Sequence, residues 1–192
     1  SKKGKVRAII TEMLMSEIEQ GNIQALIARA PDFFGLKNSM LIELGAKNFM
    51  KGKKAMWFGN IDKKHSFIYT PDAAKATALL GNSDIAYSQI WNLPSTDNNM
   101  TVRDWLELIA AELNVSPRYN VLSMNMMTVM GLFVPIIKEV KEMAYQFTTD
   151  YYFNSSKFEK EFNFSTTSPG FAVKEVMKIL KTQTKQEKSS EQ

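Results

Sequence analysis

Hydrophobic residues recur at helical spacing over the first twenty positions of the chain. One helical face carries apolar side chains at Val6, Ile9, Ile10, Met13, Leu14 and Ile18. Gly21 follows this pattern and is expected to end the helix. The apolar run at residues 23–29 is too short for a helix and stops at Pro31, which predicts a buried strand. Residues 31–37 are then expected to form a loop, and residues 39–50 a second helix.

Short apolar runs alternate with helix signals through the middle of the chain. Residues 55–59 and 66–69 predict two strands, and the polar residues between them are typical of a turn. The Thr-Pro-Asp sequence at residues 70–72 combines a capping residue, a proline and an acid, so it predicts a helix start. Gly81 is expected to end that helix.

A further strand and helix are predicted at residues 89–93 and from Thr101 onward. Thr101 and Asp104 form a near capping box in front of an apolar helical face. The alternation of strands and helices predicts an α/β fold.

The segment from residue 119 to residue 137 contains no charged residue and is long enough to span a bilayer. Polar residues and Pro135 lie inside it, so a buried helix or pocket wall is favoured over a transmembrane span. Residues 136–147 are expected to form an amphipathic helix and residues 151–153 a short strand.

The end of the chain divides into a folded part and a tail. A short helix is expected through Phe162, and Ser168 with Pro169 opens a last helix that reaches about Leu180. We therefore expect residues 1–180 to form one folded unit. Residues 181–192 are polar and are expected to be a disordered tail.

Composition excludes several classes of protein. The chain has no Cys and one His among its 192 residues, so it holds no disulfide, thiolate nucleophile, Cys-based metal site or multi-histidine metal centre. Its net charge is only +4, and four of its 24 basic residues are Arg, which is a poor composition for reading nucleic acid. We expect a cytoplasmic protein with no nucleic-acid partner and no membrane span.

Five segments resemble, in the same order, motifs of one protein family. They are residues 29–35 (RAPDFFG), 65–74 (HSFIYTPDAA), 89–93 (QIWNL), 101–109 (TVRDWLELI) and 152–164 (YFNSSKFEKEFNF). The family is the extended short-chain dehydrogenases/reductases, also called the NAD-dependent epimerase/dehydratase family. Each motif is short, but five in one order are more specific than any one of them.

The resemblance implies a fold that this chain contains only in part. It covers the C-terminal portion of an NAD(P)-binding Rossmann-type fold, whose glycine-rich half is absent from the chain. Neither G-x-G-x-x-G nor a P-loop occurs in the sequence. The implied cofactor is NAD or NADP, and the implied partner is an N-terminal Rossmann half of the same protein, expected before Ser1. The resemblance leaves open whether the protein forms a homodimer.

The resemblance also assigns residues at the end of the first strand. Ala30, Pro31 and Phe33 are expected to contact the cofactor. Asp32 stands where the family has a substrate-binding Asn, so it either accepts substrate hydroxyls, or acts as a base, or fixes its own loop. Asn38 matches a substrate Asn of the family, with a role in loop structure as the alternative.

His65 stands where many family members have an Arg that holds a nucleotide-sugar diphosphate. A neutral His is a poor substitute for a bidentate guanidinium, so the third substrate-binding residue departs from the family pattern. A surface His at a strand end is the alternative, and it is the one that we favour.

No catalytic residue is assigned. The family's Tyr-x-x-x-Lys pair would fall at Gly4 and Ala8, where the sequence has no such side chains. We expect the substrate side of an epimerase/dehydratase or reductase for a sugar-like or other small hydroxylated substrate, inactive as this chain alone. The alternative is a non-catalytic NAD(P)- or ligand-binding protein that has lost the Tyr/Lys chemistry.

Overall fold

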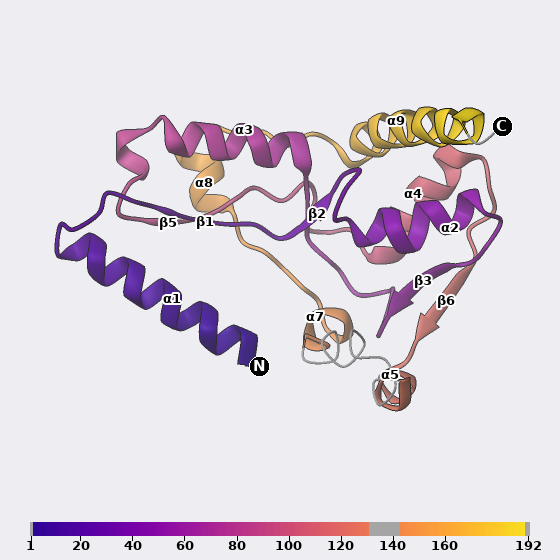
Figure 1. The fold of residues 1–192 in the computed structure, drawn as a ribbon, viewed down its shortest axis with the longest axis horizontal. Coiled ribbons are helices and arrows are strands. Elements are labelled where there is room, and N and C mark those ends of the chain that lie inside the picture. Colours follow the sequence, from indigo (N-terminus) through magenta and orange to yellow (C-terminus); the bar gives the residue numbers. More distant parts are fainter. Residues whose placement is uncertain (1, 131–142, 191–192) are drawn as a thin grey trace.

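Parallel strand pairs and helices alternate along the chain, which confirms the predicted α/β fold (Figure 1). The computed structural model describes residues 2–130 and 143–190. Its strands form three parallel pairs: β1 (Ile27–Arg29) with β5 (Ile90–Asn92), β2 (Asp32–Phe34) with β4 (Phe67–Tyr69), and β3 (Ala55–Phe58) with β6 (Tyr119–Leu122). Because parallel strands need a crossover connection, each pair joins segments that lie far apart in the sequence.

Residues 32–34 form the strand β2 where the sequence predicts a loop. The pairing with β4 supplies hydrogen-bond partners that no local pattern reveals, and the Phe34 side chain is fully buried. The preceding strand β1 is shorter than predicted, since it begins at Ile27 rather than at residue 23. Only Ala30 and Pro31 separate the two strands, so this stretch is a nearly continuous extended segment.

The helix signals in the middle of the chain are confirmed. Helix α3 spans Thr70–Gly81 and has Pro71 in its first turn. Helix α4 spans Val102–Leu113 behind a complete capping box, in which Thr101 and Asp104 satisfy each other's backbone amides. The predicted helix at residues 39–50 is a π-helix, η1 (Leu41–Ala46), followed by α2 (Lys47–Met50). A short 3₁₀-helix, η2 (Asp84–Ala86), precedes β5.

The uncharged segment contains β6 and α5 (Met124–Met130), and its residues from 131 onward lie outside the described residues. The predicted helix at residues 136–147 also lies largely outside them, apart from the start of α7 (Tyr145–Thr148). Along the described stretches, we find no helix with the length and hydrophobicity that crossing a bilayer requires.

The final helix is longer than predicted. After α8 (Ser156–Glu161), helix α9 runs from Pro169 to Ser190, so residues 181–190 are helical where the sequence predicts a disordered tail. No Gly or Pro interrupts this stretch, and Lys and Gln are good helix formers. Lys181 anchors it by donating to the carbonyl oxygen of Glu112, at 2.7 Å.

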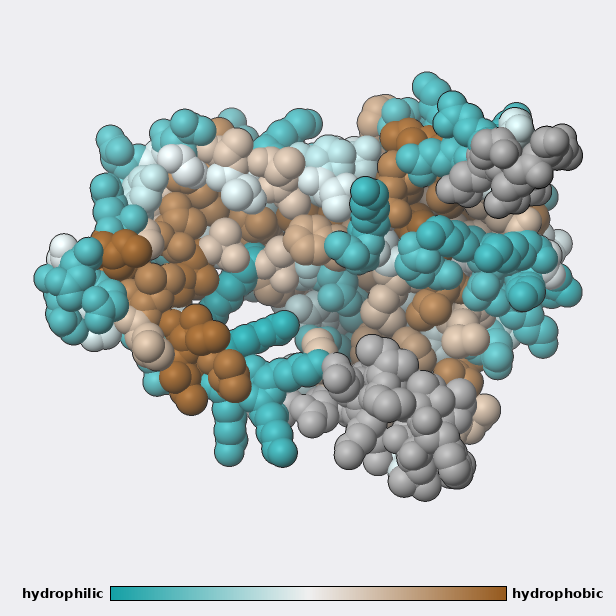
Figure 2. Space-filling view, in the orientation of Figure 1, coloured by the Kyte–Doolittle hydropathy of each residue, from teal (hydrophilic) through white to brown (hydrophobic). Residues whose placement is uncertain are grey.

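Two hydrophobic clusters make up the core. The larger joins η1, β3, α4 and α9, and the smaller joins α3, β5 and α8. Helix α1 (Lys2–Glu19) contributes no residue to either cluster, and Ile18 is its only buried residue. Its apolar positions Val6, Ile9, Ile10 and Met13 are each more than half exposed, and Figure 2 shows hydrophobic side chains gathered over it.

Candidate functional site

A cavity of about 260 Å³ collects most of the residues that the sequence assigns to the site. Ala30, Pro31, Asp32, Phe33 and Asn38 all line it. We call it the Asp32 pocket. Ala30 and Pro31 reach it because they follow the end of β1, where the chain turns into β2. Pro31 is buried, whereas the Phe33 side chain is 40% exposed at the cavity.

Asp32 is held by His65, the remaining residue of the predicted set. The His65 Nε2 lies 2.8 Å from the Asp32 Oδ2. Because an ionised carboxylate can only accept hydrogen bonds, the His65 ring donates from Nε2. His65 is 1% exposed while the Asp32 side chain is 40% exposed. The buried ring thus fixes a carboxylate that faces the cavity, and the alternative of a surface His is wrong.

Aromatic rings enclose His65. Ring centroids lie within about 6 Å of it for Trp57, Phe67, Phe147 and Tyr151, and Phe147 stacks on it at an interplanar angle of 8°. These residues come from β3, β4, α7 and the segment after α7. The surroundings leave the imidazole little freedom to turn away from Asp32.

The polar residues Arg7, Gln146 and Tyr151 of the pocket escape the sequence-based assignment. Arg7 of α1 and Tyr151 both line the cavity beside Asp32. Burial is the main cause that raises the pKa of Tyr151 above its ordinary value; Asp32 and Tyr145 raise it further, and Arg7 opposes them. No local sequence pattern predicts that Tyr151 lines the pocket. Its position depends on a parallel bridge with His65, which lies far away in the sequence.

The pocket therefore offers an acceptor, a cation and a phenol around one small space. Asp32 can accept a hydroxyl, Arg7 can hold an anionic or carbonyl oxygen, and Tyr151 can donate its proton. Within residues 2–130 and 143–190, no group of His, Asp and Glu side chains has an arrangement that suits a metal ion.

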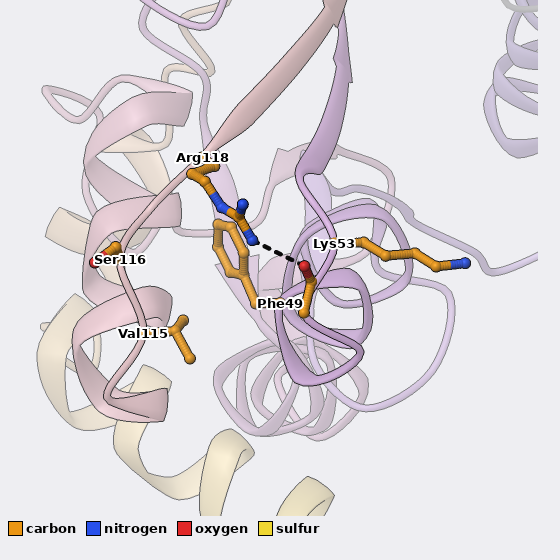
Figure 3. Close-up of a pocket in the computed structure, with 6 residues that line it drawn as sticks. Phe49, Lys53, Val115, Ser116 and Arg118 are labelled. Atoms are coloured by element: carbon orange, nitrogen blue, oxygen red, sulfur yellow. Dashed lines mark hydrogen bonds between the residues drawn. The ribbon is translucent and has the colours of Figure 1, made fainter.

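A second cavity, of about 400 Å³, lies at the amino ends of β3 and β6 (Figure 3). Arg118 lies across it, and its Nη2 donates to the carbonyl oxygen of Gly52 at 2.8 Å. Figure 3 shows the Lys53 side chain pointing away from the other labelled residues. We call this cavity the Arg118 pocket. Among the described residues that line it, Arg118 is already bonded to the backbone, and none is an Asp or Glu that could accept a substrate hydroxyl.

Comparison with known proteins finds similarity only at the level of structure. No family model matches the sequence, and no curated protein matches it. Solved structures do match. A UDP-glucuronic acid 4-epimerase from Bacillus cereus, in complex with UDP-glucuronic acid and NAD, superposes with a TM-score of 0.68 at 15% identity. The match covers 89% of this chain and 50% of the epimerase.

Two further enzymes give the same result. A UDP-N-acetylglucosamine 4-epimerase from Methanobrevibacter ruminantium matches with a TM-score of 0.66 at 19% identity, over 89% of this chain and 50% of its own. A dTDP-glucose 4,6-dehydratase from Bacillus anthracis, in complex with NAD, matches with a TM-score of 0.65 at 13% identity, over 87% of this chain and 48% of its own. The chain thus spans about half the length of these enzymes, and its fold is similar to half of an NAD-dependent epimerase or dehydratase of the extended short-chain dehydrogenase/reductase type.

Proposed function

We propose that this chain supplies the substrate side of an NAD(P)-dependent epimerase/dehydratase or reductase. The substrate is a sugar-like or other small hydroxylated molecule. One observation carries the proposal: the Asp32 pocket brings together Asp32 and Asn38 with the three cofactor-side residues, and His65 supports Asp32 from behind. The sequence motifs point to the same residues, and their proximity in the fold supports the proposal.

The pocket suits the nicotinamide end of a dinucleotide. Ala30 and Pro31 leave room for close approach, and the exposed Phe33 ring offers a flat apolar surface. A bound nicotinamide would supply hydride chemistry. The similar structures of the Bacillus cereus and Bacillus anthracis enzymes contain NAD, which agrees with this role.

The exposed face of α1 is the proposed contact for the other half of the protein. Val6, Ile9, Ile10 and Met13 form an apolar stripe, and the outward residues of β1 are exposed as well. Apolar surface of this kind marks an interface. We assign this surface to the contact with an N-terminal, cofactor-binding Rossmann half. A second copy of the protein is the alternative partner. The lack of Cys agrees with a cytoplasmic location.

Titration of the full-length protein with NADH and NADPH tests this function. Binding of either cofactor, followed by fluorescence, is the expected result, and the Phe33→Ala variant should bind more weakly than wild type. The Ser116→Ala variant, altered in the Arg118 pocket, is the matched control and should bind as wild type does. Failure of both cofactors to bind would contradict the proposal.

A non-catalytic binding protein is the second candidate. Gly4 and Ala8 favour it, because neither residue can transfer a proton. Such a protein would bind NADH or NADPH without oxidising it in the presence of any carbonyl compound. Turnover measurements on the cofactor-loaded protein therefore separate the two candidates.

A further inference from the structure

The Asp32 pocket contains a phenol and a cation that no family motif assigns. Tyr151 comes from the segment after α7, and Arg7 comes from the first half of α1. Arg7 is adjacent in sequence to Ala8, on the helix whose Gly4 and Ala8 lack catalytic side chains. A tyrosine and a cation therefore share one cavity, although they do not belong to one local motif.

Tyr151 is fixed by backbone pairing. Its amide donates to the carbonyl oxygen of Lys64 at 2.9 Å, and its own carbonyl accepts from the Ser66 amide at 3.0 Å. These bonds form a parallel bridge between Tyr151 and His65, and the two rings lie 4.9 Å apart. The ring is therefore positioned by the same residue that holds Asp32.

Four titratable or charged groups surround the phenol. Asp32 comes from β2, His65 from the segment before β4, Tyr145 from α7 and Arg7 from α1. Burial, Asp32 and Tyr145 raise the pKa of Tyr151, so its resting form is the neutral, proton-carrying phenol. Arg7 acts in the opposite direction and favours the phenolate once the proton has left.

We propose that Tyr151 is the proton donor of the Asp32 pocket and that Arg7 stabilises the phenolate it leaves, in place of a pair at Gly4 and Ala8. The inference rests on the proposed function. In the step, the Tyr151 O–H bond breaks and the proton passes to a substrate carbonyl oxygen. The carbonyl carbon accepts a hydride from a reduced nicotinamide, which is oxidised as the carbonyl is reduced to an alcohol. Water then returns a proton to the phenolate.

Substrate class follows from the same contacts. Tyr151 donates to the carbonyl oxygen, while Asp32 accepts a neighbouring hydroxyl. The site therefore takes a hydroxylated aldehyde or ketone in the reductive direction. This assignment chooses the reductase within the proposed function, because a phenol that holds its proton suits reduction better than oxidation.

The test uses the full-length protein, loaded with whichever of NADH and NADPH it binds. The probes are glyceraldehyde and two activated dicarbonyls, methylglyoxal and diacetyl, which need little recognition to be reduced. Tyr151→Phe should lower kcat roughly 100-fold or more and leave the cofactor Kd unchanged. The control Tyr152→Phe, at the exposed neighbouring position, should keep the wild-type rate.

A second readout follows the phenol directly, without any substrate. Absorbance at the tyrosinate band during an alkaline titration should show a phenol with a pKa above about 10 that Tyr151→Phe removes. Arg7→Gln should move that pKa still higher, because the opposing positive charge is gone.

Each failure has a distinct meaning. If wild type binds neither NADH nor NADPH, the proposed function fails, and the Tyr151 assignment fails with it. If the cofactor binds and Tyr151→Phe stays within about threefold of the wild-type rate, the Tyr151 assignment alone is overturned. It is also overturned if the cofactor-loaded wild type reduces none of the three probes, or if Arg7→Gln leaves the tyrosinate titration unchanged.

Discussion

The Asp32 pocket and the Arg118 pocket differ in what surrounds them more than in size. The Arg118 pocket is the larger, at about 400 Å³, but its inward cation is already bonded to the Gly52 carbonyl oxygen. The Asp32 pocket, at about 260 Å³, places Arg7, Asp32 and Tyr151 around open space, with buried His65 behind Asp32. The difference teaches that a binding site is identified better by its polar side chains than by its volume. Those side chains must be held in position and still be available to bond a ligand.

The largest expected effect is a loss of stability on replacing a glycine with alanine, and it differs between two glycines that have the same backbone conformation. Gly52 and Gly59 both have φ of +67°, but a Cβ at Gly59 would run into the Phe147 carbonyl group, whereas a Cβ at Gly52 meets nothing. Gly59→Ala should cost roughly 2–5 kcal/mol, because steric overlap adds to the left-handed strain. Gly52→Ala should cost only about 1–2 kcal/mol. Urea denaturation measures the free energy of unfolding of both variants, and equal losses would contradict the close approach of the Phe147 carbonyl group to Gly59.

Removal of His65, which lies behind the Asp32 pocket, and of Arg118, which lines the Arg118 pocket, gives the next effect. His65→Ala should destabilise the protein by roughly 2–4 kcal/mol, because it leaves a cavity among four aromatic rings. Arg118→Ala removes one hydrogen bond at the surface and should cost about 1 kcal/mol. Chemical denaturation of both variants tests the contrast. A smaller loss for His65→Ala than for Arg118→Ala would show that the Asp32 pocket lacks a rigid support.

The smallest effect concerns an ion pair outside both pockets. Arg103 donates to Asp62 at 2.6 Å and thereby lowers the pKa of that carboxyl. A lowered carboxyl pKa stabilises the fold above the ordinary Asp value of about 3.9, and this stabilisation is lost as the pH falls through the lower, folded pKa. The stability difference between wild type and Arg103→Gln should therefore shrink in strong acid to what Arg103 contributes by packing over the Tyr119 ring. Denaturation at a series of pH values measures it, and a difference independent of pH would exclude this ion pair as its source.

Local signals predict where α3 and α4 begin, but they do not predict which strands pair. The Thr-Pro-Asp sequence predicts α3, and Thr101 with Asp104 predicts α4, since a cap acts on its own first turn. Strand β2 was missed, because its hydrogen-bond partners are in β4, which no periodicity in residues 31–37 can show. The continuation of α9 beyond Leu180 was missed for a related reason: it is anchored to Glu112 of α4.

The site, like the strand pairing, depends on contacts between segments that lie far apart in the sequence. The motif resemblance assigned Asp32 and His65 separately, but only the fold shows that their side chains meet at 2.8 Å. Burial of His65 could not be predicted, because its ring neighbours come from four separate segments. Arg7 and Tyr151 carry no motif at all. They become part of the pocket only when the fold brings α1 beside the segment after α7.

Amide hydrogen exchange in the full-length protein, with and without NADH and NADPH, tests the central claim most directly. If the Asp32 pocket is the substrate and nicotinamide site, a bound cofactor slows exchange at residues 30 and 32–34. Residues 49–53, at the Arg118 pocket, keep their rates. Protection at residues 49–53, or unchanged exchange at residues 30–34 with a cofactor bound, would contradict the account.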